Sequence, residues 1–348
     1  ILIQNNNNLK LFAPYSLVKT MRAGILVLGP MLARFRKAKV SLPGGCSIGT
    51  RPVDIHLKCL SKLGVKYNIS NGYVFAEAKK GLIGNRIKFP KISVGATENL
   101  IIAASMAKGN TILSNCAIEP EIKDLVKFIN KIGGRIKWIG KRTLKIYGVK
   151  KFRENNYKIM PDRIEAGTYM MAAAVTEGNI LINGIDPKII RTEIDTLRTI
   201  GIKIKTSKNN IRVVGTNKIK NVNIKTSPYP GFPTDLQAQL TVLLCKAKNY
   251  SIINEEIFEN RFMHCAELNR MGAKIVTKAN KAFVEGNIIF KSAELMATDL
   301  RASVSLILAA LAAKGKSTIN RIYHLDRGYE EIEKKLRKVG ARIKRVYR

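Results

Sequence analysis

Acidic residues are scarce in this chain of 348 residues, which carries 25 Asp and Glu against 61 Lys and Arg and therefore a formal net charge of +36. Such a charge is typical of proteins with nucleic-acid, membrane or anionic partners. The lysines, however, are spread over the whole length without a concentrated arm or stripe. Aromatic residues make up only 7%, and no zinc-ligand spacing or other nucleic-acid-binding motif is present. We interpret most of the charge as general surface composition and expect no nucleic-acid partner.

Cysteine pairs and long apolar runs are also missing. The five cysteines form no CxxC pair and are odd in number, which argues against a disulfide framework and predicts reduced thiols and a cytoplasmic location. The longest apolar stretch, ASVSLILAALAA at residues 302–313, is too short to span a bilayer, so we expect no membrane partner. With 46% hydrophobic residues, the chain is still able to bury the cores of two domains.

One pattern recurs along the chain: an apolar helical run that ends in a glycine, followed by a short alternating strand. The glycines recur about seventy residues apart, at Gly64, Gly133, Gly201, Gly272 and Gly340. Glycine directly after a helical run is typical of a helix C-cap. Upstream helices such as EAGTYMMAAAV are apolar almost all round, and we expect them to be buried. The period predicts α/β modules that pack against one another.

Five such units account for the chain, and the candidate domain boundary lies in YKIMPDRIEAGTY, at residues 157–169. We predict a first domain over residues 1–159 and a second domain of three units over residues 160–348. Because five units do not divide evenly between two domains, we expect a further unit of about seventy residues before residue 1.

The segment LPGGCSIGTRP places a cysteine in an unusual setting. Cys46 follows Gly44 and Gly45, and Gly49 and Arg51 come soon after it. Glycines let the backbone turn freely and approach a ligand, and a nearby arginine lowers the pKa of a thiol. The pattern indicates a reactive cysteine on a loop that moves, with an ordinary flexible turn as the alternative.

Several charged residues stand at expected helix starts. For Asp235 in PTDLQAQ and Asp299 in ATDLRAS we weigh two interpretations, an N-cap and a carboxylate aimed at a ligand. Four arginines in similar positions oppose the helix dipole, so the dipole does not explain them. They are Arg22, Arg261, Arg301 and Arg327. Together they predict an anion site, with solvated surface arginines as the alternative.

The three histidines, His56, His264 and His324, show no metal-ligand spacing, and we interpret them as packed or solvent-facing. The other four cysteines lie in helix or strand patterns and are expected in the core. They are Cys59, Cys116, Cys245 and Cys265.

Eight segments carry a resemblance to a known family. They are YSLVKTMRAGILVLGPMLARF, SLPGGCSIGTRPVDIHL, ISVGAT, PDRIEAGTYM, FPTDLQAQ, FENRFMH, MATDLRAS and RIYHLDRGYEEIEKKLRKVGARI. These segments resemble the enolpyruvyl transferases, and among them the UDP-N-acetylglucosamine 1-carboxyvinyltransferases of peptidoglycan synthesis. The resemblance implies a two-domain α/β fold, an inside-out α/β barrel of six repeated units, of which five are present here. It also implies a cleft between the domains that closes on the substrates.

The resemblance implies transfer of enolpyruvate from phosphoenolpyruvate to the 3′-hydroxyl of UDP-N-acetylglucosamine, with release of phosphate. Cys46 then matches the general acid, which is also the cysteine that fosfomycin alkylates, and Asp235 matches the general base. Arg327 and Arg51 match arginines that hold phosphoenolpyruvate. The remaining implied substrate contacts are Arg22, Pro52, Val53, Asp54, Ile55, Lys91, Ser93, Val94, Ile257, Arg261, Asp299 and Arg301. No metal or organic cofactor is implied, and the family is expected to be monomeric.

One family feature is absent: a Lys-Asn pair in a GAKNAALP-like turn that contacts phosphoenolpyruvate. We therefore expect weak or no catalysis from this polypeptide alone. One alternative is an inactive remnant that binds anionic ligands or nucleic acid through charge. Another is transfer to shikimate 3-phosphate, against which the cysteine loop argues.

Overall fold

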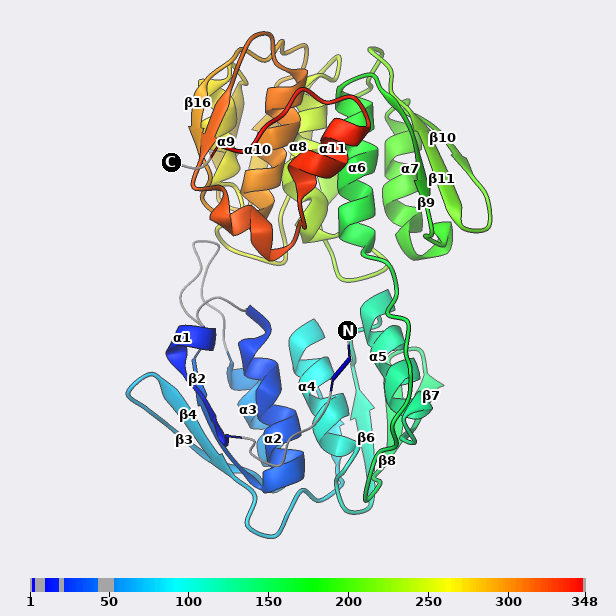
Figure 1. Ribbon diagram of the computed structural model, residues 1–348, viewed down its shortest axis with the longest axis vertical. Helices are drawn as coiled ribbons and strands as arrows, with labels where there is room; N and C mark the ends of the chain where they lie inside the picture. The colour runs from blue at the N-terminus through cyan, green and yellow to red at the C-terminus, as the bar shows by residue number, and fades with distance from the viewer. Residues whose placement is uncertain (1, 4–9, 19–21, 43–52, 347–348) are drawn as a thin grey trace. The chain divides into compact units, whose positions relative to one another are not determined.

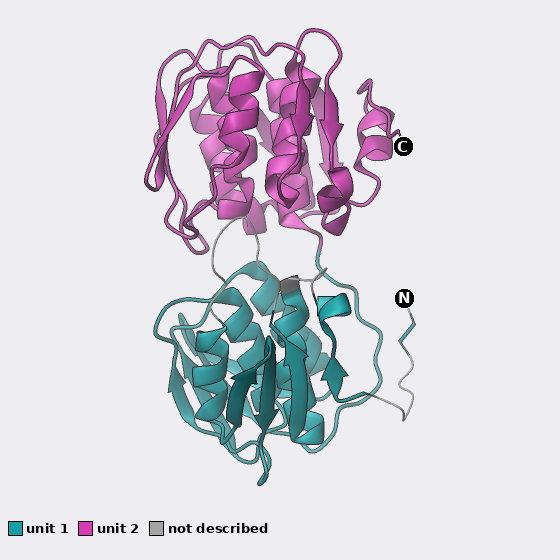
Figure 2. Ribbon diagram, turned by 90° about the vertical axis from the view of Figure 1, so that its left-hand side faces the viewer, with its two compact units in different colours: residues 1–45, 50–160 teal, residues 46–49, 161–348 magenta. Residues whose placement is uncertain are grey.

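The computed structural model describes residues 2–3, 10–18, 22–42 and 53–346, with the backbone alone for Arg22. The chain divides into two compact units between Met160 and Pro161 (Figure 2). The prediction from the sequence ends the first domain at residue 159. Each unit has a hydrophobic core of its own, formed by residues of that unit alone.

Unit 1 begins with a short strand and several helices and continues as alternating helices and strands (Figure 1). Its helical elements are α1 (Tyr15–Val18), η1 (Arg22–Val27), α2 (Leu28–Phe35), α3 (Asp54–Ser61), α4 (Val94–Ala104) and α5 (Pro120–Lys131). Its strands are β1 (Phe12–Ala13), β2 (Lys37–Ser41), β3 (Lys66–Ser70), β4 (Tyr73–Glu77), β5 (Arg86–Lys88), β6 (Asn110–Ser114), β7 (Arg135–Gly140) and β8 (Thr143–Tyr147).

Unit 2 continues the same alternation. Its helical elements are α6 (Arg163–Val175), η2 (Pro187–Ile190), α7 (Arg191–Thr199), η3 (Thr234–Leu236), α8 (Gln237–Cys245), α9 (His264–Arg270), α10 (Leu300–Ala312), η4 (Ile322–Arg327) and α11 (Ile332–Lys338). Its strands are β9 (Asn179–Asn183), β10 (Lys203–Thr206), β11 (Asn210–Val214), β12 (Ile224–Lys225), β13 (Ser251–Asn254), β14 (Ile275–Lys278), β15 (Lys281–Val284), β16 (Glu294–Met296) and β17 (Thr318–Asn320).

The sheets repeat one topology. In the orders β1-β2-β4-β3, β5-β6-β8-β7 and β12-β13-β15-β14, a parallel pair is followed by two antiparallel pairings. The sheet β10-β11-β9 has the antiparallel part alone, and β16-β17 has the parallel part alone. The recurrence of this order shows that the sequence period corresponds to a recurring structural module.

The apolar helices lie inside the units, as the sequence predicts. In unit 1, α4 packs against α2, α3 and α5, and in unit 2, α8 and α10 pack against each other and against α6 (Figure 1). All residues of α8 from Gln237 to Cys245 are buried. Because these helices are covered by neighbouring helices and by the sheets, they carry apolar side chains on every face. The four cysteines predicted for the core are buried, and none of them is in a disulfide.

The five period-marking glycines all have positive φ, between 92° and 103°. Glycine adopts this conformation readily because it lacks Cβ, which explains why it ends each helix. In four of the five turns, a side chain three residues before the glycine bonds the backbone six residues further on. Asn130 bonds both the N–H and the C=O of Ile136 at 2.8 and 2.9 Å, and Asn269 does the same to Ile275 at 2.9 Å. Arginines take this position at Arg198 and Arg337.

Three expectations about the elements are wrong. The strand expected after Gly340 is missing, because residues 341–346 form no strand. Arg261 lies in a loop before α9 rather than within a helix start. Arg327 ends η4 instead of beginning a helix, because Gly328 follows it and α11 starts only at Ile332.

Candidate functional site

The carboxylate of Asp235, in η3, lies between two arginines of unit 2. Arg261 Nη2 donates to Oδ1 at 2.5 Å, and Arg301 Nη2 donates to Oδ2 at 2.9 Å. The Arg261 side chain is 2% exposed, whereas that of Asp235 is 36% exposed. Burial raises the pKa of the Asp235 carboxyl, but Arg301 and Arg261 outweigh it and hold that pKa well below its usual range. The three residues form an ionised cluster with one surplus positive charge.

The two aspartates that looked alike in the sequence have different roles. Asp299 is the N-cap of α10, because its Oδ1 accepts from Arg301 N at 2.8 Å and from Ala302 N at 3.1 Å. Asp235 caps no helix, and its carboxylate is directed to the arginines instead. The N-cap interpretation is therefore right for Asp299 and wrong for Asp235. Asp299 indirectly supports the cluster, since it fixes the turn that carries Arg301.

Arg261 is followed closely by the buried His264, the first residue of α9. Burial lowers the pKa of His264 to about 4, an effect that Asp299 opposes and Arg261 reinforces. His264 is therefore a neutral, packed histidine, as expected from its sequence context. Its Nε2 lies 3.7 Å from Cys265 Sγ.

Glu255 organises the loop that carries two of the predicted contacts. This residue is 2% exposed, and its Oε1 accepts from Thr226 Oγ1 at 2.9 Å and from Ile257 N at 2.9 Å. Its Oε2 accepts from Thr234 Oγ1 at 2.8 Å. Thr234 directly precedes Asp235, so one buried carboxylate joins the segments of Asp235 and Ile257. Ile257 itself is 37% exposed.

Arg327 and Tyr329 lie close together in sequence but differ in environment. Arg327 is exposed, and no contact places it in the Asp235 cluster. Tyr329 is 1% exposed, and its hydroxyl accepts from Arg301 Nη1 at 3.1 Å. The structure therefore brings together Asp235, Arg261 and Arg301 with Tyr329, while Arg327 lies outside the cluster.

In unit 1 the predicted contacts lie at two helix starts. Val53 precedes α3, the exposed Asp54 pairs with Lys58 at 3.6 Å, and Ile55 is buried in the core. Ser93 is the N-cap of α4, with Oγ accepting from Ala96 N at 3.3 Å. Lys91 and Val94 on either side of Ser93 are exposed. Because α4 begins here with a capped turn, its remaining N–H groups provide the kind of terminus that favours anions.

His56 and Asn99 join these two helix starts. Asn99 Nδ2 donates to His56 Nδ1 and to Ile25 O, both at 3.1 Å. Because the amide nitrogen only donates, His56 Nδ1 accepts and the ring carries its proton on Nε2. Burial lowers the pKa of His56 to about 4, against a smaller opposing effect of Asp54. The pair fixes α3, α4 and η1 relative to one another within unit 1.

Four predicted site residues receive no structural account. Cys46, Arg51 and Pro52 lie outside the described residues, and Arg22 is described only as the first backbone position of η1. Their roles stay predictions from the sequence.

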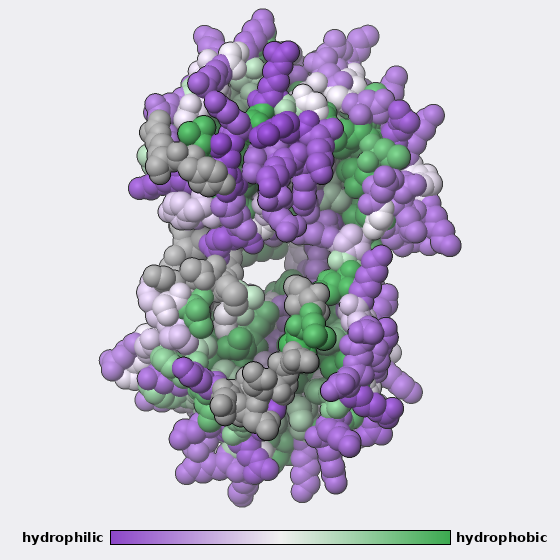
Figure 3. Space-filling view, in the orientation of Figure 1, coloured by the Kyte–Doolittle hydropathy of each residue, from purple (hydrophilic) through white to green (hydrophobic). Residues whose placement is uncertain are grey.

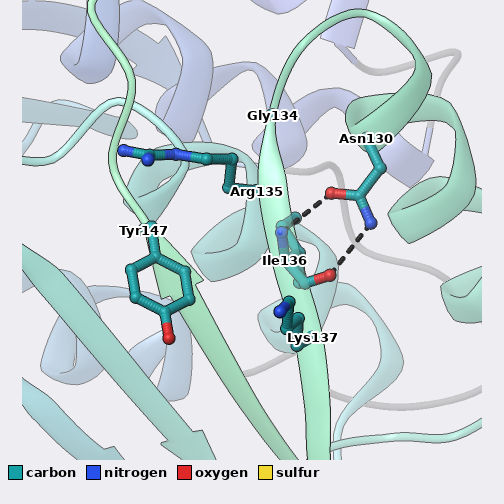
Figure 4. A pocket seen from close by; sticks show the side chains of 6 residues that line it. All are labelled: Asn130, Gly134, Arg135, Ile136, Lys137 and Tyr147. Carbon is teal, nitrogen blue, oxygen red and sulfur yellow. Dashed lines mark hydrogen bonds between the residues drawn. The ribbon is translucent and has the colours of Figure 1, made fainter.

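A surface hollow of about 370 Å³ on unit 1 lies apart from these residues (Figure 4). It is lined by Asn130, Gly134, Arg135, Ile136, Lys137 and Tyr147. The Asn130 amide is fully engaged with the backbone of Ile136, as the dashed lines show (Figure 4). We interpret the hollow as a by-product of the repeated helix-end turn.

Within the described part of the chain, no group of three or more His, Cys, Asp or Glu side chains is placed to hold a metal ion. Over the same residues, no helix has both the length and the apolar character needed to cross a membrane.

Sequence reasoning missed Tyr329, Glu255, Thr168 and Gln239, which surround or support Asp235. The only local signal is composition: Tyr329 is a single large aromatic in the charged stretch HLDRGYEEIE, and Glu255 begins EEIFENRF. Neither pattern distinguishes a buried polar residue from an exposed one, because the partners lie far away in sequence.

Comparisons with known proteins all match this chain to carboxyvinyltransferases. The family model described as EPSP synthase (3-phosphoshikimate 1-carboxyvinyltransferase) matches residues 1–336. The chain is 73% identical over 346 residues to UDP-N-acetylglucosamine 1-carboxyvinyltransferase of Pelagibacter ubique (strain HTCC1062), covering 99% of this chain and 83% of that protein. It is 54% identical over 334 residues to the protein of the same name from Geotalea uraniireducens (strain Rf4), covering 96% and 80%. These matches do not establish the expected further unit before residue 1, which stays a prediction.

Among solved structures, the fold is similar to the enolpyruvyl transferase NikO from Streptomyces tendae, with a TM-score of 0.86 and 24% identity over 95% of this chain and 79% of that one. It is also similar to EPSP synthase from Acinetobacter baumannii, with a TM-score of 0.70 and 18% identity over 93% and 78%. At these identities the likeness concerns the fold alone, and it confirms the predicted two-domain transferase architecture of repeated α/β units.

Proposed function

The chain belongs to the EPSP synthase family, whose members are carboxyvinyl (enolpyruvyl) transferases, and from this premise we propose that it transfers enolpyruvate from phosphoenolpyruvate to the 3′-hydroxyl of UDP-N-acetylglucosamine. The observation that carries the proposal is the 73% identity, over 99% of this chain, to a protein named for that reaction. The placement of Asp235 between two arginines supports it, because a reaction between anionic substrates needs fixed cations beside a proton acceptor.

The proposed reaction is an addition followed by an elimination. The sugar hydroxyl oxygen bonds to C2 of phosphoenolpyruvate, the hydroxyl proton goes to Asp235, and Cys46 gives a proton to the methylene carbon C3. In the second half, the Cys46 thiolate takes a proton back from C3, the C2–C3 double bond re-forms, and the C2–O bond to phosphate breaks, with the proton held by Asp235 going to the leaving phosphate. The acid and the base act on opposite partners of the reacting pair, which is why two separate residues are required.

The surplus positive charge of the cluster gives the proposal a physical basis. Two guanidinium groups share one carboxylate, so Asp235 is ionised but only weakly basic as long as both stay on it. An incoming phosphate or carboxylate competes for the guanidinium groups. Departure of one of them from Asp235 raises the basicity of the carboxylate at the moment the hydroxyl arrives. In this scheme Arg261 is the group that leaves and couples substrate binding to proton removal, while Arg301 stays on the Asp235 carboxylate.

We assign the other predicted residues to binding on the strength of the resemblance. Arg51 and Arg327 hold phosphoenolpyruvate in this scheme, and the start of α4 holds the diphosphate of the nucleotide sugar. Nucleotide-sugar contacts come from Arg22, Pro52, Val53, Asp54, Ile55, Lys91, Ser93, Val94 and Ile257. The exposed positions of Lys91 and Val94 and the exposed Arg327 are compatible with ligand contact, whereas Ile55 is buried and is left with its backbone for such a contact.

The test is phosphate release from phosphoenolpyruvate with UDP-N-acetylglucosamine or shikimate 3-phosphate as acceptor. We expect release with the nucleotide sugar and none with shikimate 3-phosphate, at the low rate that the missing Lys-Asn turn predicts, and a further loss of about 10²- to 10⁴-fold in kcat for Asp235→Asn. Asp195→Asn is the matched control, because Asp195 also lies between two arginines, at 3.4 Å from Arg191 and 3.6 Å from Arg198, but on the exposed surface of α7. The control variant keeps the activity of the unchanged protein.

Cys46 is tested separately with fosfomycin. We expect a covalent adduct on Cys46, detected by peptide mass spectrometry, that forms faster when UDP-N-acetylglucosamine is present, and none in Cys46→Ser. Phosphate release with shikimate 3-phosphate would reassign the acceptor. Absence of release with either acceptor, together with retained binding of UDP-N-acetylglucosamine, would make the chain a ligand-binding relative without this activity.

A further inference from the structure

The hydroxyl of Tyr329 connects three elements of unit 2 beneath the Asp235 cluster. It lies 3.1 Å from Arg301 Nη1 of α10, 2.8 Å from Thr168 Oγ1 of α6 and 3.4 Å from Gln239 Nε2 of α8. Tyr329 and Thr168 are each 1% exposed, and Gln239 is fully buried. Gly328 permits this approach, since a Cβ there would lie 2.8 Å from Leu300 Cδ2, next to Arg301.

The direction of each hydrogen bond follows from counting protons. Thr168 donates its single hydroxyl proton to Ile164 O at 2.9 Å, one turn back along α6. Toward Tyr329 the Thr168 oxygen therefore accepts, and Tyr329 is the donor. Since the proton of Tyr329 is engaged there, its oxygen is free to accept from the guanidinium of Arg301. The result is a one-way chain from Arg301 through Tyr329 and Thr168 to the backbone of α6.

Gln239 closes the arrangement around Asp235. Its Nε2 donates to Thr168 Oγ1 and to the backbone oxygen of Asp235, both at 3.1 Å. The backbone of Asp235 and the guanidinium that holds its carboxylate are thus connected to the same Thr168 hydroxyl. The Arg301 guanidinium carbon also lies 5.7 Å from the centroid of the Tyr329 ring, which adds a cation–π contact. These contacts restrict Arg301 to one orientation toward Asp235.

We propose that Tyr329 is a positioning residue for the transfer reaction: its hydroxyl, anchored on Thr168, holds Arg301 in the orientation that keeps Asp235 ready to accept the hydroxyl proton. The inference rests on the proposed function. Because Tyr329 is buried, it acts through Arg301 and does not touch substrate. A tyrosine here is specific, since a phenylalanine would keep the packing and the ring but remove the acceptor of Arg301 Nη1, leaving the Arg301 guanidinium, among the described residues, with Asp235 alone.

Charged and titratable groups surround the chain on several elements. Arg301 from α10 and Asp162 from the start of α6 act on Tyr329, and burial raises the pKa of its phenol above the ordinary value. Tyr169 of α6 lies near Tyr329, Glu165 and Glu333. Asp235 and Asp162 both act on Arg301. The phenol therefore keeps its proton at neutral pH, as donation to Thr168 requires.

The experiment compares Tyr329→Phe, Tyr323→Phe and the protein without substitution by phosphate release from pH 3 to 9, a range that includes the acid side on which Asp235 titrates. Tyr323 is a suitable control because it lies in the neighbouring η4 and is 61% exposed. We expect Tyr329→Phe to lower kcat about ten-fold with little change in either KM. The acid limb of kcat/KM, which reports ionisation of Asp235, is expected to move to higher pH in Tyr329→Phe. The reason is that a loosened Arg301 no longer lowers the pKa of Asp235 as far. The Tyr323→Phe profile stays in place.

Thr168 provides the second variant pair. Thr168→Val keeps the shape of the side chain but removes the acceptor for Tyr329, so kcat falls and the acid limb moves in the same direction. Thr168→Ser keeps the hydroxyl and restores both. Melting temperatures of all variants separate a loss of fold from a loss of positioning.

A normal kcat and an unmoved acid limb in folded Tyr329→Phe would overturn the inference. So would a Thr168→Ser variant that loses as much as Thr168→Val. If the unchanged chain itself releases no phosphate, the proposed function fails. In that case the same variants are compared by the carboxyl chemical shift of Asp235 during titration, where Tyr329→Phe is expected to raise its midpoint and an unmoved midpoint counts against the inference.

Discussion

Single buried side chains decide how the Asp235 region is held. Arg261 and Arg301 follow Asp235 by 26 and 66 residues in sequence, yet both guanidinium groups lie within hydrogen-bond distance of its carboxylate. Glu255 and Tyr329 hold the surroundings through different elements, Glu255 through the loop of Ile257 and Tyr329 through α6. In a low-dielectric interior each such polar group is costly if left unpaired, and among the described residues Arg261 Nη1 and Gln239 Oε1 have no hydrogen-bond partner.

Replacing Glu255 by Gln tests this dependence on the side of the loop. The Glu255 carboxylate accepts from two threonine hydroxyls and from the N–H groups of Ile257 and Phe258. An amide offers one acceptor oxygen in place of two, so we expect Glu255→Gln to lower the free energy of unfolding by about 1–3 kcal/mol in urea titrations. Glu256→Gln is the control, because Glu256 pairs with Lys225 near the surface, and it costs less than about 1 kcal/mol. Equal losses in both variants would contradict the assigned role.

Helix ends are the most regular feature among the elements. Each module ends a helix with a positive-φ glycine, and in four of the five an Asn or Arg side chain bonds the backbone six residues further on. That backbone position lies in a strand in three of the four, whereas Ile343, the partner of Arg337, lies in no strand. In the first module Ser61 occupies the equivalent position and bonds Lys58 O instead. A side chain too short to reach the strand is the physical reason for this exception.

Gly272→Ala isolates the backbone contribution of this turn. The φ of Gly272 is 92°, and an added Cβ would meet no atom closer than 4.0 Å, so crowding plays no part. We expect a loss of roughly 1–2 kcal/mol in unfolding free energy from the left-handed backbone alone. Gly140→Ala serves for comparison, since Gly140 lacks positive φ and its nearest contact would be an ordinary 3.5 Å. Similar stability of the two variants would show that the positive φ carries no cost here.

The elements could be predicted from the sequence to the extent that their signals are local. The glycine period, the buried helices and the Asp299 cap depend on residues a few positions apart, and the structure confirms them. The partners of Asp235 could not be predicted, because two long-range arginines outcompete the backbone N–H groups that an aspartate at a helix start usually accepts from. Arg327 shows the same limit, since Gly328 ends η4 before α11 begins. The loop of Cys46 lies outside the described residues, so its role is still a prediction.

On the scale of the whole molecule, the two units have separate cores and different titrating groups. In unit 2, burial lowers the pKa of His264 from 6.5 to about 4. In unit 1, His56 is lowered similarly, but burial together with Glu121 and Glu119 raises the pKa of Glu98 to about 7. Hydrophilic side chains lie over much of the visible surface of both units, in keeping with the many lysines, with hydrophobic patches between them (Figure 3). The single tryptophan, Trp138, lies in unit 1 and reports that unit alone.

We expect acid to destabilise unit 2 more than unit 1. Between about pH 6.5 and pH 4 the unfolded chain protonates His264 while the folded unit does not, so stability falls as pH falls, by up to about 3 kcal/mol. His56 acts with the same sign in unit 1, but Glu98 gains stability for the folded state as pH falls through about 7, and the two effects offset each other.

Urea unfolding at pH 7 and pH 5 checks this difference. Tryptophan fluorescence follows unit 1, and far-ultraviolet circular dichroism follows both units. The circular dichroism midpoint should move further on acidification than the fluorescence midpoint. A His264→Gln variant should reduce that difference, and equal movement of both midpoints in the unchanged chain would contradict the assignment.

The recurring helix-end turn also bears on how such a chain can arise and be rebuilt. Because Asn and Arg bond the same backbone position after the glycine, the modules have equivalent joints even where their sequences differ. Duplication of one ancestral module, followed by sequence divergence, would leave modules that share the helix-end turn and differ elsewhere. Chimeras that exchange whole modules at the glycine should therefore preserve strand register, while cuts inside a module should not.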